Sequence, residues 1–416
     1  MKQRLAIIGT GIAGMGCAHY LKEAFDLTLF EKNDYPGGHT NTIFADEDGK
    51  EIPIDTGFMV FNHVTYPLFT KLLSDLQVPT TKTDMSFSVQ HLPSGLEYCG
   101  SGFNGLFAQR GNIFSVRHIK MLKEISRFNR ESVQILEDTG YDFVTLADYI
   151  RRHKFCDDML WKYLVPMSSA VWSTPMDTML QFPAKTLVRF FFNHGFLGLN
   201  TQHQWYTVNG GSRQYREKLI APFKDRIRLN SGVINVRRKE NEVLVSSVGG
   251  EEQFDKVIIA THADEALAML IDPGKRETEL LSPFKYAKNS AMVHTDGRSM
   301  PKLKRVWSSW NYRIEEKGGE KRASTIYWMN SLQHVSRKKD YFVSINDPGN
   351  IERSKIIKEL TYTHPLFTVK TSEAQKELPE LNRTGPVYYC GSYFRYGFHE
   401  DALWSALELS KNLLAI

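Results

Sequence analysis

The first 31 residues carry the feature that most constrains this chain. An apolar run over 5–8 is followed at once by the sequence GTGIAG at 9–14, a helical stretch at 15–24 and a second apolar run at 27–30 that Glu31 closes. This order of strand, glycine turn, helix, strand and acid is typical of the βαβ unit that binds a dinucleotide. We therefore predict a parallel sheet whose first turn faces phosphates.

Each residue type in this unit has a physical role. Gly9 permits the tight turn, Gly11 lets the backbone approach a pyrophosphate, and Gly14 lets the helix pack closely on the strand. The helix N-terminus presents free N–H groups and a positive dipole to the phosphates. Glu31 can accept hydrogen bonds from a ribose, and its charge disfavours a 2′-phosphate there. The predicted cofactor ligands in this unit are Gly9, Gly11, Ile12, Ala13, Gly14, Glu31 and Lys32.

A second glycine pair helps to distinguish FAD from NAD, the two common dinucleotide cofactors. Gly37 and Gly38 follow the ribose acid closely, and another polar turn comes at 54–58. Two glycines let a loop run close over a second part of the cofactor. A simple dehydrogenase would instead continue through alternating strands and helices, and this chain does not. We therefore predict FAD as the cofactor, with Gly38, His39 and Thr40 against it.

Composition limits the classes of protein that remain. The 416 residues are long enough for two or three domains, and 42% hydrophobic with 24% charged residues excludes a disordered chain. A net charge of +5 is far too small for a dedicated nucleic-acid binder. Four widely spaced cysteines without a C-x-x-C pair favour neither disulfides nor a zinc site, and we predict no metal.

The expected location follows from the same features. The apolar run near the N-terminus is broken by glycines and lacks a small-residue cleavage site, so we do not interpret it as a signal peptide. No uninterrupted apolar stretch is long enough to span a bilayer. We expect a cytoplasmic protein, with peripheral contact to the inner face of a membrane left open.

The C-terminal end is predicted to return to the cofactor. Residues 386–390 form a short apolar run, 391–398 a glycine and aromatic loop, and a helix opens at His399. Acids in its first turn, Glu400 and Asp401, suit the helix dipole. Three consecutive side chains diverge around a helix, so these residues make a poor metal site. The acids either cap the helix or belong to an N-terminus that is aimed at the flavin.

Two internal segments are also assigned to the nucleotide domain. Residues 205–212 precede a helix, and a strand-rich section begins at 227 and ends in the small residue Thr261. No repeat or low-complexity linker is present, so interleaved domains are expected. We predict an FAD-binding domain from 1–62, 205–265 and 385–416, and a substrate-binding domain with a helical cap from 63–204 and 266–384.

Together these elements resemble the FAD-dependent amine-oxidase-like superfamily, which includes monoamine oxidases, protoporphyrinogen oxidase and phytoene desaturases. The resemblance implies an α/β fold in which a Rossmann-like FAD-binding domain is interleaved with a mixed β-sheet substrate domain and a helical cap. It also implies that the backbone of Val233 holds the adenine and that Gly391 and Glu400 belong to a C-terminal flavin motif. The remaining implied cofactor ligands are Thr261, His399 and Ala402.

A narrower resemblance rests on longer motifs. Residues 390–401, 310–312, 327–333 and 364–367 look like the signature of flavoproteins associated with cyclopropane fatty acyl synthases. That subfamily includes a domain fused ahead of the plant synthases and bacterial flavoproteins that accompany such lipid methyltransferases. Linoleate isomerase is a more distant relative. The resemblance implies a lipid or fatty acyl substrate and a lipid methyltransferase as a partner.

The chain departs from its relatives at two places. Ala402 and Ala406 stand where relatives often carry Gly, which affects the backbone near the flavin. Many amine oxidases hold a water against the flavin with a lysine on a strand. The corresponding segment here is predicted to be 289–294, which contains no lysine. This absence counts against an amine oxidase.

The middle of the chain supplies the predicted cap and substrate walls. Residues 110–160 carry helical patterns in which apolar residues alternate with Lys and Arg, as expected either for a helix packed on the core or for a basic face on anionic lipid. The aromatic run at 187–192 suits a buried helix or the wall of an acyl tunnel. Residues 286–347 are strand-like, with a hairpin predicted around a polar turn at 315–322.

A substrate that has no lone pair can react with a flavin only if it presents an activated C–H bond, such as one beside a double bond. The leading hypothesis is therefore hydride abstraction from an acyl chain beside a double bond, giving desaturation or isomerisation. One alternative is an amine oxidase, and another is a non-catalytic flavoprotein partner of a lipid methyltransferase. The predicted catalytic residues are Tyr206, Tyr396, Phe398 and His399.

Overall fold

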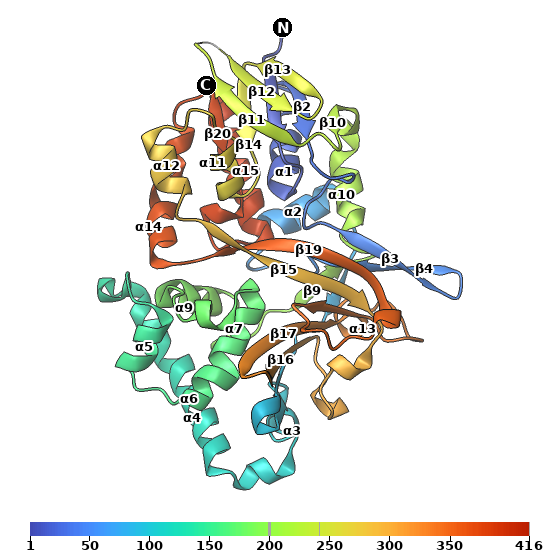
Figure 1. Ribbon diagram of the computed structural model, residues 1–416, viewed down its shortest axis with the longest axis vertical. Coiled ribbons are helices and arrows are strands. Elements are labelled where there is room, and N and C mark those ends of the chain that lie inside the picture. Colours follow the sequence, from blue (N-terminus) through green and yellow to red (C-terminus); the bar gives the residue numbers. More distant parts are fainter. Residues whose placement is uncertain (199–200, 241, 416) are drawn as a thin grey trace.

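A five-stranded parallel sheet forms one end of the molecule (Figure 1). The computed structural model describes residues 1–198, 201–240 and 242–415. The strand order is β10-β2-β1-β14-β20, so the edges of the sheet come from distant parts of the chain. The strands are β1 (Arg4–Ile8), β2 (Asp26–Phe30), β10 (Ile227–Arg228), β14 (Lys256–Ile259) and β20 (Val387–Tyr389).

Both faces of this sheet are buried, as its apolar strands predict. Leu5 and Ile7 belong to a core shared with α1 (Ile12–Leu21) and α15 (His399–Ala415). Ala6 and Ile8 belong to a second core on the other face. That face is covered by α11, α12 and the antiparallel sheet β11-β12-β13. These elements are β11 (Val233–Arg238), β12 (Val243–Ser247), β13 (Gly250–Phe254), α11 (Ala263–Met269) and α12 (Lys275–Leu281).

A seven-stranded mixed sheet crosses the middle of the molecule (Figure 1). Its order is β19-β15-β18-β17-β16-β7-β8, and only the pair β16 and β7 is parallel. The predicted hairpin is present, but its turn is confined to Gly318 and Gly319, because most of 315–322 is strand. The strands are β7 (Phe87–His91), β8 (Leu96–Cys99), β15 (Lys285–His294), β16 (Trp310–Lys317), β17 (Glu320–Trp328), β18 (Phe342–Ile345) and β19 (Ile356–Leu366).

The prediction of a strand without lysine is wrong. Strand β15 begins at Lys285 and therefore contains Lys285 and Lys288 ahead of the segment 289–294. Both lysines are exposed, whereas Asn289 and Ala291 are buried. Strand alternation places Lys288 on the face opposite Asn289, while Lys285 shares the face of Asn289 but lies exposed at the first position of the strand.

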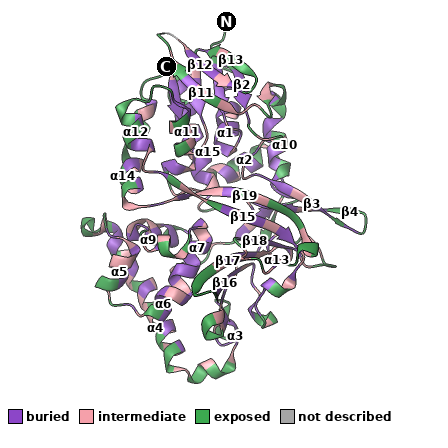
Figure 2. Ribbon diagram, in the orientation of Figure 1, coloured by how far each residue is buried: buried purple, intermediate pink, exposed green. Residues whose placement is uncertain are grey.

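Helices of the central third of the chain form a separate layer beside the mixed sheet. Helix α4 buries His118, Met121 and Phe128, α7 is mostly buried, and α9 buries half of its residues (Figure 2). The predicted helical patterns at 110–160 and 187–192 are confirmed. The helices are α3 (Gly102–Leu106), α4 (Val116–Glu131), α5 (Leu146–Arg152), α6 (Asp157–Met159), α7 (Val165–Trp172), α8 (Met176–Met179) and α9 (Ala184–Asn193).

Short elements connect the two main sheets. Strand β9 pairs with β5 and β6, and β3 and β4 form a hairpin. The predicted α/β fold, a Rossmann-like sheet interleaved with a mixed sheet and helices, is confirmed; the domain boundaries remain predictions. In the part of the chain that the structure describes, no helix is both long and apolar enough to cross a membrane. The remaining elements are β3 (Thr42–Glu47), β4 (Lys50–Asp55), β5 (Phe61–Asn62), α2 (Pro67–Asp75), β6 (Thr80–Thr83), β9 (Trp205–Val208), α10 (Arg213–Ile220), α13 (Met329–Leu332) and α14 (Val369–Glu377).

Candidate cofactor and active site

The turn between β1 and α1 has the shape that its three glycines predict. A Cβ atom at Gly14 would lie 1.9 Å from the carbonyl oxygen of Gly9, so the helix could not approach the turn with any larger residue. Gly9 has a φ of +96°, which favours glycine. A Cβ atom at Gly11 would meet nothing within 4 Å. The first and third glycines are therefore required by packing, while the second faces open space.

The second glycine loop lies against the first. A Cβ atom at Gly38 would be 3.4 Å from the Cα atom of Gly11, and the Gly37 N–H donates to the hydroxyl of Thr10 over 3.3 Å. Two glycine loops thus meet at the N-terminus of α1. This arrangement gives a polar ligand access to backbone from both loops.

Glu31 is buried beside these loops, with 5% of its surface exposed. Its carboxylate accepts hydrogen bonds from Thr10 N–H and Oγ1 and from Asn33 N–H and Nδ2, at 2.5–3.1 Å. The side chain thus holds the turn in place, and a ribose would share these acceptors. Lys32 points elsewhere, because its Nζ atom pairs with Glu265 at 2.7 Å on the surface.

Val233 lies at the same end of the sheet. The N–H of Ser231 donates to the carbonyl oxygen of Glu31 over 2.8 Å, which brings the start of β11 beside the predicted ribose acid. A Cβ atom at Gly232 would meet the Cβ atom of Lys32 at 3.3 Å. Although more than 200 positions separate them in the chain, Glu31 and Val233 are neighbours, as the prediction of an adenosine site requires.

The carboxyl ends of three parallel strands converge on the first turn. A Cβ atom at Gly9 would lie 3.2 Å from Cγ2 of Thr261, and one at Gly391 would lie 3.4 Å from the Thr261 carbonyl oxygen. Ligands of open parallel sheets bind at this edge. Gly9, Thr261 and Gly391 are therefore brought together where the prediction placed a cofactor.

The start of α15 differs in part from the prediction. The Glu400 carboxylate accepts hydrogen bonds from the N–H groups of Leu68 and Phe69 at 2.8 and 2.9 Å, so it caps helix α2. Its side chain is thus already engaged at the start of α2, and the cofactor contact of Glu400 stays a prediction. The neighbouring Ala402 is buried in the helix–helix contact.

Ala406 is accommodated by a small residue on the facing helix. A Cβ atom at Gly16 of α1 would lie 3.2 Å from Cβ of Ala406. Relatives often carry a glycine at the α15 position of Ala406. In this chain the small residue at the contact is Gly16 of α1, so α1 and α15 still pack closely. This departure leaves the fold unchanged.

His399 is part of a buried polar chain. Its Nε2 atom hydrogen-bonds to the Tyr215 hydroxyl at 2.7 Å, and that hydroxyl bonds to Oγ1 of Thr40 at 2.5 Å. The imidazole also stacks on Phe58 with ring centres 3.8 Å apart. Burial lowers the pKa of His399 to about 3, so the ring is neutral near pH 7. Through the Tyr215 hydroxyl it positions Thr40 in the second glycine loop, and its catalytic role stays a prediction.

His39 has a buried ring nitrogen with nothing to bind. It stacks on Tyr362 with ring centres 4.8 Å apart and lies 5.2 Å from the ring of His364. Its Nε2 atom is buried and has no hydrogen-bond partner among the described residues. Burial, followed by the neighbouring imidazoles, lowers the pKa of His39, so the ring is neutral. An unpaired buried polar atom next to the glycine loops fits a site that binds a polar group.

Tyr396 and Phe398 join a group of aromatic side chains, here called the ring cluster, between α7, α9 and the loop before α15. Phe398 stacks on Phe190 with centres 4.7 Å apart, and the indole N–H of Trp172 donates to the Tyr396 carbonyl oxygen over 3.1 Å. The cluster excludes water from the start of α15. Its members are Trp172, Phe182, Phe190, His194, Phe196, Trp205, Tyr396 and Phe398.

Tyr206 belongs to a different group from the other three predicted catalytic residues. It lies on β9 and stacks on His63, the residue after β5, with ring centres 4.1 Å apart. Phe61 lies 6.0 Å from Tyr206, and Phe69 connects Phe61 to His399 through centre distances of 5.3 and 5.1 Å. The structure thus links Tyr206 to the site through a chain of rings.

Two buried acids were missed by the sequence analysis as site residues. Burial raises the pKa of Asp401 to about 7, and its carboxyl accepts a hydrogen bond from the Phe398 N–H over 2.9 Å. Asp55, 1% exposed, accepts hydrogen bonds from Thr42, Ser212 and Gln333. Asp401 could have been predicted, because it is an acid at the third position of a helix that follows an apolar loop. No local sequence pattern marks Asp55.

The geometry fits FAD. Two open glycine loops meet at a helix N-terminus, a ribose acid and the start of β11 flank them, and the unpaired His39 nitrogen lies beside them. The chain also matches the family described as flavin containing amine oxidoreductase over residues 12–302. It belongs to this family. The protein is therefore an FAD-dependent oxidoreductase, and the predicted cofactor is confirmed.

Solved structures with the same fold are distant in sequence. A putrescine oxidase with bound putrescine matches with a TM-score of 0.69 at 14% identity over 100% of both chains. A fatty acid isomerase from P. acnes matches with a TM-score of 0.68 at 15% identity over 98% of both chains. A putative protoporphyrinogen oxidase from Exiguobacterium matches with a TM-score of 0.67 at 15% identity over 99% of both chains. No curated protein matches the chain.

Proposed function

We propose that this flavin amine oxidoreductase family member abstracts a hydride from an unsaturated or modified fatty acyl chain, carried on a phospholipid. The observation that carries the proposal is the neutrality of the ring cluster. None of its side chains bears a carboxylate, and burial lowers the pKa of His194 to about 4, so this imidazole is uncharged at pH 7. A neutral wall of rings stabilises an alkyl chain by burial, whereas an ammonium group loses its hydration there without a counter-ion.

A cleft beside the ring cluster supplies a second chemical environment. It is lined by polar residues from the end of α7 and from β16, β17 and β18, including Ser169, Thr325 and Asn346. Ser169, which lines the cleft, and Trp172 of the ring cluster are three positions apart on α7 and so lie on neighbouring positions of one helix face. Lys321 also lines the cleft. This cation suits the carboxylate or phosphate of a lipid headgroup.

When bound, FAD supplies a two-electron acceptor for the hydride. In desaturation, neighbouring carbons lose a hydride and a proton, and an external acceptor such as oxygen takes up the two electrons. In isomerisation, the hydride returns to another carbon of the same chain. In our proposal Phe398 and Tyr396 orient the chain and exclude water, and Asp401, whose pKa burial raises to about 7, holds a proton beside them.

The fatty acid isomerase fold neighbour supports this proposal only at the level of fold. A second candidate, oxidation of an amine, has support of the same kind from the family description and the putrescine oxidase neighbour. It is also favoured by Asp177, whose side chain lines the cleft and offers a carboxylate to an ammonium group. The narrower resemblance to flavoproteins of cyclopropane fatty acyl synthases supports the acyl substrate.

Mass spectrometry of acyl chains distinguishes the candidates. The purified FAD-loaded protein is incubated in air with unsaturated and methyl-branched phospholipids. Loss of two hydrogens from a chain establishes desaturation, and unchanged mass with shifted double bonds establishes isomerisation. No change in any chain contradicts the proposal, and peroxide release with an amine panel then supports the amine oxidase. A flavin inert to both panels, together with a tight complex with a lipid methyltransferase, identifies a non-catalytic partner.

A further inference from the structure

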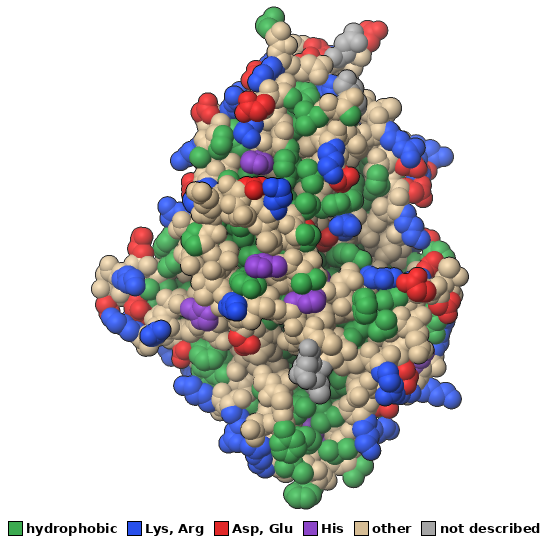
Figure 3. Space-filling model, turned by 180° about the vertical axis from the view of Figure 1, so that it is seen from behind, with side chains coloured by type: hydrophobic (Ala, Val, Ile, Leu, Met, Phe, Trp, Pro, Cys, Tyr) green, Lys and Arg blue, Asp and Glu red, His purple; other side chains and the backbone are tan. Residues whose placement is uncertain are grey.

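The end of the molecule opposite the parallel sheet exposes large apolar side chains. Phe114 and Val116 are 87% and 84% exposed, and Phe103 and Ile113 are 62% and 38% exposed. They lie on α3, on the turn Arg110–Phe114 and at the start of α4, at the bottom of Figure 1. We call these four residues the apolar tip. In Figure 3 the bottom of the molecule likewise carries hydrophobic side chains with Lys and Arg on both sides.

The chain segment that carries the apolar tip contains cations and no acid, and the nearest acids on another element are Asp157 and Asp158 of α6. Between Glu97 and Glu124 the sequence contains no acid and four cations: Arg110, Arg117, Lys120 and Lys123. Within the described residues only Arg117 of these four has an ion-pair partner, Asp158. The other three cations are exposed; Arg110 donates hydrogen bonds to Phe107 O and Asn104 Oδ1, and Lys120 and Lys123 have no ion-pair partner among the described residues.

An adjoining segment adds more positive charge. Leu303 and Val306 pack on Cys99 and Ala108, at the base of α3, so the segment 302–306 lies next to the tip. Lys302, Lys304 and Arg305 of this segment are exposed and have no ion-pair partner in the described part of the chain. The acid that contacts this segment, Glu97, is 5% exposed and is occupied by the N–H groups of residues 302 and 303.

The tip is held in place by the structure behind it. His118 of α4 hydrogen-bonds through Nε2 to the Leu106 carbonyl oxygen at 3.0 Å, and its ring packs on Phe107 at 5.4 Å. Met121, one helical turn further on, is buried in the main core. The exposed side chains therefore project from an ordered platform, which lowers the entropy cost of inserting them elsewhere.

We propose that the apolar tip docks on an anionic lipid bilayer, with Phe114 and Val116 inserted among the acyl chains and the surrounding lysines and arginines on the headgroups. Apolar side chains rimmed by cations are the composition of interfacial membrane anchors. Protein interfaces are instead depleted of lysine. The docking goes beyond the proposed acyl chemistry and does not depend on it, since binding is measured without turnover.

Vesicle sedimentation tests the proposal with the FAD-loaded protein. Vesicles of phosphatidylcholine with and without phosphatidylglycerol are compared at low and high salt. We expect binding only to the anionic vesicles, weakened by salt. Two double variants, Phe114→Ser/Val116→Ser and Lys120→Gln/Lys123→Gln, are compared with the wild type. The affinity of each for anionic vesicles should fall by about tenfold or more.

The matched control is Ile234→Ser/Val248→Ser, which removes two apolar side chains that are 61% and 71% exposed at the other end of the molecule. It should bind like the wild type, and all variants should retain their flavin absorbance. The proposal is overturned if the wild type ignores anionic vesicles or if the Phe114→Ser/Val116→Ser variant binds unchanged. It is also overturned if the tip proves to be an interface between copies, seen as a concentration-dependent dimer that this variant abolishes.

Discussion

At the scale of single residues, Asp401 has the most informative titration. Burial raises its pKa from the ordinary 3.8 to about 7, so the folded state holds the proton more tightly than the unfolded state. Its contribution to stability is full below pH 4 and is lost as the pH rises towards 7, a difference of up to roughly 4 kcal/mol. Asp401→Asn removes this titration and keeps an oxygen for the Phe398 N–H. We expect the variant to be more stable than wild type above pH 7, and no longer so near pH 4.

Urea unfolding at a series of pH values measures this difference. Glu408→Gln is the control, because Glu408 lies on the same helix but is half exposed and, among the described residues, forms an ion pair only with Lys411. Its stability should follow the wild-type pH profile. An Asp401→Asn profile parallel to wild type would show that the carboxyl is ionised in the folded protein at neutral pH.

Phe398 carries the prediction about the ring cluster. Phe398→Ala removes the ring that stacks on Phe190 at 4.7 Å and leaves the glycine loops untouched. Substrate-dependent flavin reduction should slow about tenfold or more because the chain is no longer positioned, while FAD stays bound. Stopped-flow absorbance gives the rate of flavin reduction. The control is Phe143→Ala, which removes an exposed phenylalanine from the layer of central helices. An unchanged rate would remove Phe398 from the site.

Sequence reasoning at this scale succeeds where the signal is local. It places His399 and Asp401 at the start of a helix, because an apolar loop and acids in a first turn are neighbours in the chain. It misses the bond from His399 to Tyr215, because 184 positions separate them. It also misses that Glu400 caps α2, a contact that spans 332 positions.

At the scale of elements, the turn between β1 and α1 offers a matched pair of substitutions. Gly14→Ala places a Cβ atom 1.9 Å from a backbone oxygen, so helix α1 must shift; we expect a loss of about 3 kcal/mol of stability together with FAD binding. Gly11→Ala meets no atom within 4 Å and has an ordinary φ of −62°, so the fold should remain within about 0.5 kcal/mol of wild type.

The new methyl group of Gly11→Ala nevertheless stands where the pyrophosphate should approach. We therefore expect FAD affinity to fall about tenfold or more without a loss of stability in the FAD-free protein. Fluorescence titration with FAD and urea unfolding measure the two quantities separately. Full FAD affinity in Gly11→Ala would place the pyrophosphate elsewhere.

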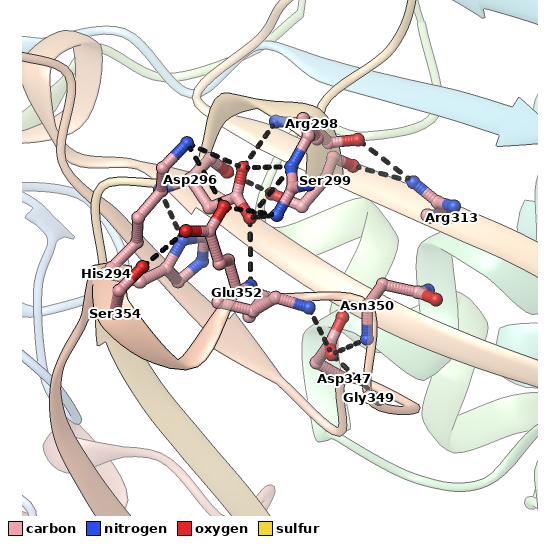
Figure 4. Close-up of polar contacts among 12 residues, drawn as sticks. His294, Asp296, Arg298, Ser299, Arg313, Asp347, Gly349, Asn350, Glu352 and Ser354 are labelled. Atoms are coloured by element: carbon pink, nitrogen blue, oxygen red, sulfur yellow. Dashed lines mark hydrogen bonds and ion pairs between the residues drawn. The ribbon is translucent and has the colours of Figure 1, made fainter.

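A charge network joins the segment just after β15 to the segment just before β19 (Figure 4). The fully buried Asp296 side chain accepts hydrogen bonds from Arg298 at 2.6 and 2.9 Å and from the Glu352 N–H at 3.0 Å. Asp296 also donates its own N–H to Nδ1 of His294, whose Nε2–H then donates to Ser344. The network thus fixes the end of β15.

Asp296→Asn should cost about 2–3 kcal/mol, because the Arg298 guanidinium loses one of its two charged partners and keeps only Glu352 among the described residues. The Arg298 contacts lower the pKa of Asp296, so its stabilisation is present above the ordinary value and disappears as the pH falls through the folded value. The gap between wild type and variant in urea unfolding should therefore close in strong acid. FAD content should not change, and a loss of FAD in the folded variant would contradict the separation of this network from the site.

The sequence predicts the presence of a strand or helix where the apolar periodicity is strong. It does not predict the residue at which the element begins or ends. Strand β15 continues to Lys285 because it pairs with β19 along its whole length, up to Lys285 opposite Leu366. Tertiary pairing thus extends a strand through polar residues whose pattern alone indicates none. The hairpin of β16 and β17 likewise extends through the charged segment 315–322 to its two glycines.

At the scale of the whole molecule, the parallel sheet is assembled from three distant parts of the chain. The glycine turn, the second glycine pair and the C-terminal loop each point to one cofactor, which is why the interleaved architecture was predictable. The ring cluster was not, because its members come from α7, from α9 and the residues flanking it, from β9 and from the loop before α15, and no sequence spacing relates them. Such a site is determined by the packing of the layers.

The same packing predicts that the chain unfolds as one unit. A single core contains Leu5 of the parallel sheet, Met121 and Phe190 of the helical layer, and Leu413 at the C-terminus. A hundredfold rise in free FAD above saturation adds about 2.7 kcal/mol to stability. Spread over this chain length, that energy should raise the midpoint of a single thermal transition by about 3 °C, whereas riboflavin, which lacks the pyrophosphate, should have little effect. Calorimetry that resolves two transitions, with only one moved by FAD, would show instead that the helical layer folds independently of the cofactor sheet.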